Sequence, residues 1–87
     1  MADEDRDVRL RRLHMRSWRR GTREMDLILG AFADSGLAGL GPDELDAYER
    51  LLEENDHDLY GWVAGRSAAP DDHAPLVARI RAHRRIG

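Results

Sequence analysis

The most apolar segment of the chain reads TREMDLILGAFAD and spans residues 22–34. Its apolar side chains fall on more than one side of a helix, a pattern typical of a helix packed against several neighbours. We therefore predict a central helix over about residues 22–34 and place Leu27 and Phe32 in the hydrophobic core. The glycines at positions 36, 39 and 41 predict a flexible connection after this helix.

Helical apolar spacing continues on both sides of this segment. An earlier helix is expected over about residues 5–16, where acidic residues at the start favour the positive end of the helix dipole. A third helix is expected to begin at Pro42, because proline is favoured in a first turn. A short fourth helix follows Asp56, whose carboxylate can cap it, and a fifth begins near Asp72.

Together these segments predict an all-α fold, a small single-domain bundle of about five short helices over residues 1–87, with flexible first and last few residues. A chain of 87 residues holds one small core, and no segment shows the alternation typical of a strand. We expect the core to include Leu27, Phe32, Leu45, Leu52, Leu59, Trp62 and Ile80.

The composition excludes several kinds of chemistry. The chain has no cysteine and no lysine, which excludes disulfides, thiolate metal sites, cysteine nucleophiles and Schiff-base catalysis. The four histidines are dispersed, and residues 56–58 (Asp-His-Asp) lack the ligand spacing of a calcium loop. We therefore expect no catalytic residue and no metal site.

Apolar stretches are too short to span a bilayer, and the acidic start of the chain argues against a secretory or transit signal. We expect a cytoplasmic protein with no membrane insertion.

Charge is strongly segregated along the chain. Eight arginines lie between residues 6 and 23, and nine acidic residues lie between residues 34 and 58, although the net charge is only −3. Such patterning favours a binding protein. The arginines at 9, 12, 16 and 19 share one helix face, so a small arginine-rich nucleic-acid-binding or regulatory protein is an alternative. The acidic cluster and the lack of a known nucleic-acid-binding motif favour a solvated or partner-facing stripe instead.

One short segment concentrates charge around a glycine. Residues 19–26 read RRGTREMD, and glycine permits a close approach of another backbone. Two interpretations remain open from composition alone. The charges can form an ion-pair network at a helix start, or they can form a polar patch that recognises a partner.

The pentapeptide RGTRE at residues 20–24, followed by Met-Asp-Leu, resembles the RGxxE signature of the FAD assembly factor family of succinate dehydrogenase. This family includes SdhE-type proteins and, in mitochondria, succinate dehydrogenase assembly factor 2. The similarity extends over roughly residues 9–84, in order and in spacing. Many relatives have methionine where this chain has Thr22, a variable position of the signature.

The resemblance implies a five-helix protein that is not itself an enzyme. Members bind the flavoprotein subunit of succinate dehydrogenase, and often that of fumarate reductase, and promote covalent attachment of FAD to a histidine of that subunit. Carried over by position, the partner-binding residues are Arg20, Gly21 and Glu24. From charge and spacing we add Arg16, Arg19 and Arg23.

We expect the free protein to be a monomer that binds neither FAD nor metal tightly. No glycine-rich phosphate-binding loop follows a strand, and a chain this short predicts no cavity of several hundred Å³. The compartment expected for bacterial members is the cytoplasm, and for eukaryotic relatives it is the mitochondrial matrix.

Overall fold

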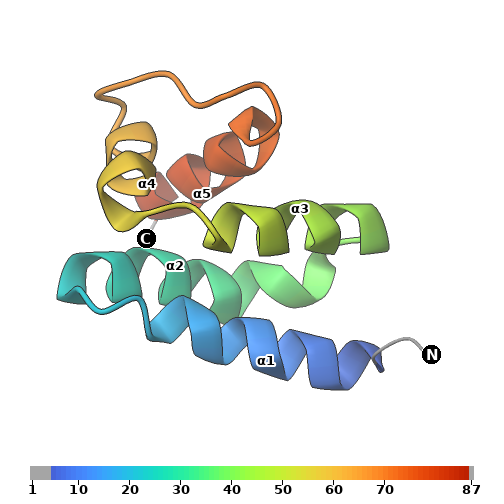
Figure 1. Cartoon of the computed structure of the whole chain (residues 1–87). Coiled ribbons are helices and arrows are strands. Elements are labelled where there is room, and N and C mark those ends of the chain that lie inside the picture. Colours follow the sequence, from blue (N-terminus) through green and yellow to red (C-terminus); the bar gives the residue numbers. More distant parts are fainter. Residues whose placement is uncertain (1–4, 87) are drawn as a thin grey trace.

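Two antiparallel helices, α1 (Arg6–Trp18) and α2 (Arg23–Gly36), form the base of the molecule (Figure 1). The computed structural model describes residues 5–86, and the expectation of flexible chain ends concerns residues outside this range. The Thr22 hydroxyl caps α2 by accepting the Met25 N–H at 3.3 Å. Because α1 and α5 both pack against α2, its predicted central position is confirmed.

The connection after α2 is ordered, and the expectation of a flexible glycine linker was wrong. It forms a short 3-10 helix, η1 (Leu37–Gly39), because Leu37 and the following Leu40 are both buried in the core. The Arg6 guanidinium also donates to the carbonyls of Ala38 and Leu40, at 2.9 and 3.0 Å. Apolar burial and these bonds therefore fix the connection against α1.

Helix α3 (Pro42–Leu52) begins at the predicted proline. It is followed by α4 (Asp56–Val63) and, across a loop that arches over the top of the molecule in Figure 1, by α5 (Ala74–Ile86). The predicted cap of α4 needs correction. The side-chain oxygen of Asn55 caps the helix by accepting the Asp58 N–H at 2.9 Å, because the Asp56 carboxylate is turned towards Arg20.

The all-α class is confirmed, and residues 5–86 contain no strand. The core contains six of the seven expected side chains: Phe32, Leu45, Leu52, Leu59, Trp62 and Ile80. Leu27 was predicted wrongly, since its side chain is 51% exposed. Two positions along a helix rotate a side chain by about 200°, so Leu27 faces away from the buried Met25 and Leu29. No helix within the described range is long and apolar enough to cross a membrane.

A buried polar pair joins α1 to α3. Ser17 Oγ donates to the Leu13 carbonyl at 2.8 Å and lies 2.6 Å from the Tyr48 hydroxyl, and both side chains are fully buried. Burial raises the pKa of Tyr48 to about 12, although the Ser17 hydrogen bond acts in the opposite direction. The pair satisfies two hydroxyls that would otherwise be costly to bury.

Candidate functional site

The signature residues lie at the turn between α1 and α2, residues 19–22, which we call the motif turn. Gly21 adopts φ +100°, a conformation that side chains other than glycine rarely take. No heavy atom would lie within 4 Å of a Cβ added at Gly21, so this backbone faces open space. Glycine is needed here for the turn itself, and it leaves the surface free for close approach by another molecule.

Arg20 points inward. Its guanidinium donates to the carbonyl oxygens of Leu52 and Glu54, at 2.5 and 2.6 Å, and to the Asp56 carboxylate at 2.8 Å. The side chain is only 11% exposed. In the free protein Arg20 therefore holds the motif turn against the connection between α3 and α4.

The backbone of the motif turn is fixed from a second side. The Arg20 N–H donates to the Asp26 carboxylate at 2.6 Å, across the first turn of α2. Thr22 caps the same helix through its hydroxyl. With both ends of the turn bonded to α2, Gly21 is presented in one fixed conformation.

Glu24 and Arg23 are exposed on the first turn of α2. The Glu24 carboxylate lies 3.8 Å from the Arg84 guanidinium of α5, with more than half of the Glu24 side chain in solvent. Within the described part of the chain, the Arg23 side chain has no hydrogen-bond or ion-pair partner. An exposed ion pair of this kind adds little to stability, so Glu24 is free to form a stronger bond with another protein.

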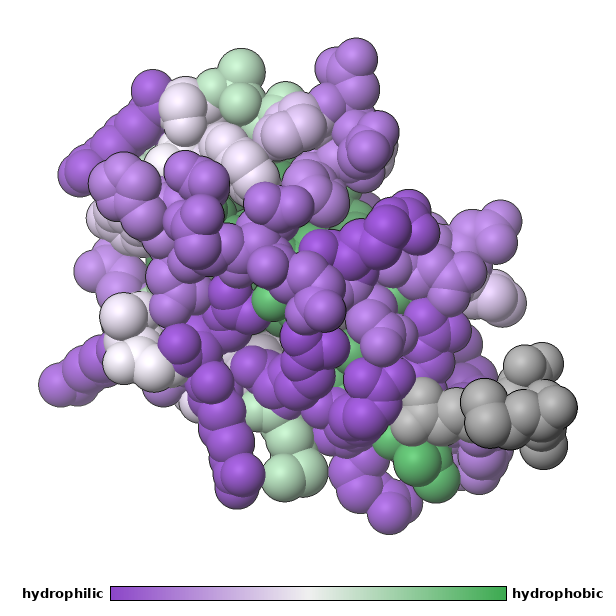
Figure 2. All heavy atoms as spheres, in the orientation of Figure 1, coloured by the Kyte–Doolittle hydropathy of each residue, from purple (hydrophilic) through white to green (hydrophobic). Residues whose placement is uncertain are grey.

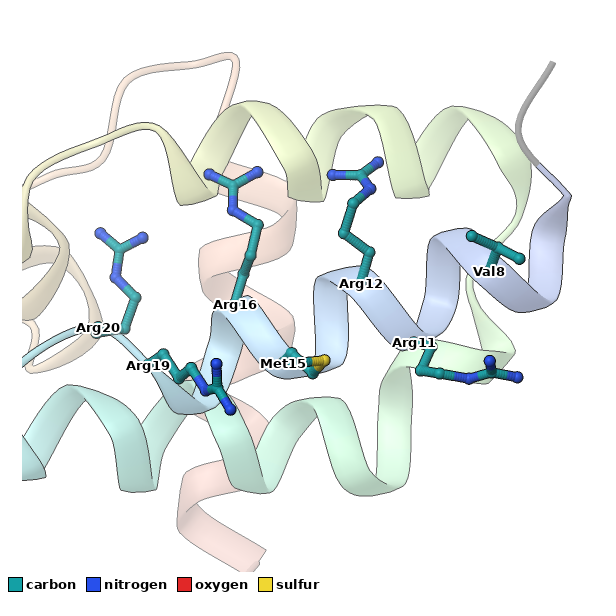
Figure 3. Close-up of a pocket in the computed structure, with 7 residues that line it drawn as sticks. All are labelled: Val8, Arg11, Arg12, Met15, Arg16, Arg19 and Arg20. Carbon is teal, nitrogen blue, oxygen red and sulfur yellow. The ribbon is translucent and has the colours of Figure 1, made fainter. Parts of the chain in front are cut away.

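The two remaining predicted residues are Arg16 on α1 and Arg19 directly after its end, and they differ in direction. Arg16 reaches towards α3, where it pairs with Glu53 at 2.7 Å, whereas Arg19 points away from α3 (Figure 3). Arg19 is exposed, and its side chain has no hydrogen-bond or ion-pair partner among the described residues. Of the six predicted positions, the structure therefore leaves Arg19, Gly21, Arg23 and Glu24 available on the surface, while Arg16 and Arg20 bond within the fold.

Apolar surface extends from the motif along α2, and the sequence prediction missed it. A hollow of about 530 Å³ is lined by Arg23, Glu24, Leu27, Ile28, Ala31 and Arg84. Positions 24, 27, 28 and 31 form one helical stripe, and this 3.6-residue periodicity could have identified the exposure of Leu27. The exposed leucine therefore lies one turn beyond the signature glutamate.

The expectation of no cavity of several hundred Å³ also needs correction. A second hollow, of about 580 Å³, runs along α1. Both hollows open onto solvent, because helices as short and as few as these leave grooves between long side chains at their surface. Figure 2 shows that the face containing α1 is largely hydrophilic, with small hydrophobic patches at its lower edge.

The acidic segment that follows α3 is occupied by internal contacts. Asp56 binds Arg20, and the Asp58 carboxylate accepts a hydrogen bond from the Asn55 side chain at 3.0 Å. In the part of the chain that the structure covers, no three histidine, cysteine or acidic side chains gather in a metal-binding group.

Comparison with known proteins identifies a family that matches most of the chain. The family described as the flavinator of succinate dehydrogenase matches residues 11–84. The FAD assembly factor SdhE of Acetobacter pasteurianus is 33% identical over 87 residues, which is 99% of this chain and 80% of that protein.

Longer eukaryotic proteins are also similar. The mitochondrial succinate dehydrogenase assembly factor 2 of Aspergillus terreus is 40% identical over 74 residues, 85% of this chain and 24% of that protein. The corresponding protein of Debaryomyces hansenii is 46% identical over 60 residues, 69% of this chain and 42% of that protein. The chain thus spans about a quarter to two fifths of the length of these mitochondrial relatives.

Proposed function

Because the chain belongs to the family of flavinators of succinate dehydrogenase, we propose that it is an assembly factor that binds the flavoprotein subunit of that enzyme and promotes covalent attachment of FAD. The observation that carries this proposal is the motif turn itself. Gly21 is exposed on a turn whose conformation is fixed from within by Arg20 and Asp26, and Glu24 is exposed on the first turn of α2, which follows directly.

The proposed interface is centred on four surface positions, Arg19, Gly21, Arg23 and Glu24, with Leu27 at its apolar edge. Gly21 allows the partner's backbone to approach closely, and Glu24 can exchange its weak contact with Arg84 for a charge-assisted hydrogen bond to the partner. Arg16 and Arg20 support this surface from behind through their bonds to α3 and to the segment that follows it.

We propose that the chain acts by binding and is not itself an enzyme. Binding to one conformation of the flavoprotein shifts the population towards that conformation, in which the histidine and the flavin are correctly placed for reaction. The chemistry then belongs to the flavoprotein, and the assembly factor binds neither FAD nor metal tightly. Calorimetric titration of the isolated chain with FAD tests this point, and one-to-one binding at micromolar affinity would contradict it.

Three further statements belong to the same proposal. The free chain is a monomer, which sedimentation measurements test. The flavoprotein of fumarate reductase is a second client, which the assay below tests with that subunit as substrate. The site of action is the cytoplasm, which the similarity to a bacterial FAD assembly factor supports.

The central experiment reconstitutes flavinylation. The apo flavoprotein subunit of succinate dehydrogenase is incubated with FAD, with and without the chain, and covalent flavin is measured by fluorescence of the denatured protein in a gel. We expect covalent flavin to form faster with the wild-type chain, and Glu24→Ala to abolish most of that gain. Losing a bond to a buried partner charge costs about 2–5 kcal/mol, or at least thirtyfold in affinity.

Arg81→Glu is the matched control, since it changes the charge of an exposed α5 residue that lies outside the proposed interface. It should leave the rate unchanged. Equal flavinylation with and without the wild-type chain would contradict the proposed function.

A further inference from the structure

The outer face of α1 combines exposed apolar side chains with unpaired cations. Val8, Arg11, Met15 and Arg19 follow one another at helical spacing, and we call this stripe the α1 outer face. Val8 and Met15 are 47% and 46% exposed. They belong to the hollow of about 580 Å³, whose other lining residues are all arginines, so it has no acidic lining residue.

The arginines that face α3 and the segment after it are paired with acidic residues. Arg12 pairs with Glu49 at 3.0 Å, Arg16 pairs with Glu53, and Arg20 pairs with Asp56. Figure 3 shows Arg12, Arg16 and Arg20 extending towards α3, Arg19 pointing away from α3, and Arg11 lying along α1 towards its N-terminal end.

Arg11 and Arg19 have no ion-pair partner within the described residues. Arg19 lies eight positions after Arg11, which corresponds to about 12 Å along the axis of α1. Met15 lies midway between the two cations. The α1 outer face therefore presents two positive charges on either side of an apolar contact point.

We propose that the α1 outer face binds an acidic amphipathic segment of the flavoprotein subunit, with apolar side chains on Val8 and Met15 and carboxylates on Arg11 and Arg19. The inference rests on the proposed function and extends its interface. Arg19 is both the last residue of this stripe and the first residue of the motif turn, so a partner seated on Gly21 continues onto α1.

The positive charge and the apolar side chains of the α1 outer face together favour an acidic amphipathic segment as the binding partner. Exposed apolar side chains beside unpaired cations are complementary to a segment that carries both acidic and apolar residues. The phosphates of a nucleic acid would bind the cations but would make no favourable contact with the apolar side chains of Val8 and Met15. They would also meet the carboxylates of Glu49 and Glu53 beside Arg12 and Arg16.

The test measures binding of the full chain to the purified apo flavoprotein at about 50 mM and about 200 mM salt. The double variant Arg11→Glu/Arg19→Glu should bind at least about tenfold more weakly at the lower salt, and the deficit should shrink at the higher salt. Met15→Glu should also weaken binding, whereas Met15→Leu should bind within about twofold of wild type because it keeps the apolar contact.

Two controls separate local from general effects. Arg81→Glu makes one such charge reversal on α5, half the charge change of the double variant, and should bind like the wild type. Circular dichroism should show unchanged helix content for every variant, because each substituted side chain is exposed. If the double variant Arg11→Glu/Arg19→Glu lost helix content, its binding would not be interpretable. The proposal would then be tested by comparing the binding of Met15→Glu with that of Met15→Leu.

Three outcomes would overturn the inference. If the wild-type chain does not bind the flavoprotein, the proposed function fails and this inference fails with it. If the wild type binds and Glu24→Ala weakens binding, but the α1 variants bind normally, only this inference is wrong. If a fluorescent DNA duplex binds the wild type and the double reversal abolishes only that binding, the α1 outer face is a nucleic-acid site.

Discussion

The guanidinium of Arg20 lies 2.8 Å from the carboxylate of Asp56, so the turn before α2 is bonded to the first residue of α4. The same side chain donates to the backbone carbonyl of Leu52, the last residue of α3, and to that of Glu54 in the connection that follows. A residue that the family signature marks for recognition therefore connects three helices of its own fold.

We predict that Arg20→Ala is destabilising. Removing the guanidinium leaves two carbonyls and a partly buried carboxylate without their donor, at a cost of about 2–3 kcal/mol. In a domain of this size the melting temperature should fall by about 10 °C or more. Thermal denaturation followed by circular dichroism measures this. A variant that melts like the wild type but no longer binds the flavoprotein would show that Arg20 is a partner contact and not a structural one.

The effects of Gly21 on folding and on binding can be separated. Its φ of +100° strains any other residue by roughly 1–2 kcal/mol, while the open space around it adds no clash. Gly21→Ala and Gly21→Arg should therefore melt at similar temperatures, about 5–15 °C below wild type, and only Gly21→Arg should block flavinylation. Gly39→Ala, at an open position without positive φ, is the control and should cost less. Equal flavinylation by Gly21→Ala and Gly21→Arg would contradict close approach at this turn.

Leu27 and Leu29 provide a matched pair on one helix. Leu29 is fully buried and Leu27 is half exposed. Leu29→Ala should cost about 2–5 kcal/mol, whereas Leu27→Ala should cost less than about 1 kcal/mol. Denaturant unfolding measures both values. If Leu27→Ala were as destabilising as Leu29→Ala, the exposed apolar stripe of α2 would be part of the core.

Stability should fall in alkali because of Tyr48. The folded pKa is raised from 10.0 to about 12, so the contribution of the protonated hydroxyl is complete below pH 10 and is lost as the pH rises through about 12. The total loss is roughly 2–3 kcal/mol. Phenolate absorbance in a Tyr60→Phe background reports Tyr48 alone and should rise together with loss of helix. Ionisation of Tyr48 well before any unfolding would contradict its burial.

Much of the architecture could be predicted from the sequence. The helical spacing of apolar residues, Pro42 at a helix start and the absence of strand patterns were enough for the number and order of the α-helices. Family membership was predictable from RGTRE at residues 20–24 and is confirmed by the match over residues 11–84.

The features that could not be predicted from the sequence depend on the direction in which particular side chains point. Arg20 and Arg19 are neighbours with the same chemistry, yet only Arg20 reaches the carbonyls at the end of α3. Asn55 and Asp56 are both good caps, and the choice between them followed from Arg20, which is 36 residues away from Asp56 in the sequence. Such choices are made by tertiary contacts, which local patterns do not encode.

Gly30 restricts any attempt to stabilise this protein by redesign. In most helices, replacing an interior glycine with alanine adds about 1 kcal/mol of stability. At this position the added methyl group would overlap the ring of Trp18, because the indole packs directly on the bare backbone of α2. Substitutions chosen by helix propensity alone would thus force α1 away from α2 and displace the Trp18 Nε1–H from the Asp34 carboxylate, to which it now donates at 3.1 Å. The residues at positions 18 and 30 are complementary in size, so a larger residue at 30 can be accommodated only if residue 18 becomes smaller.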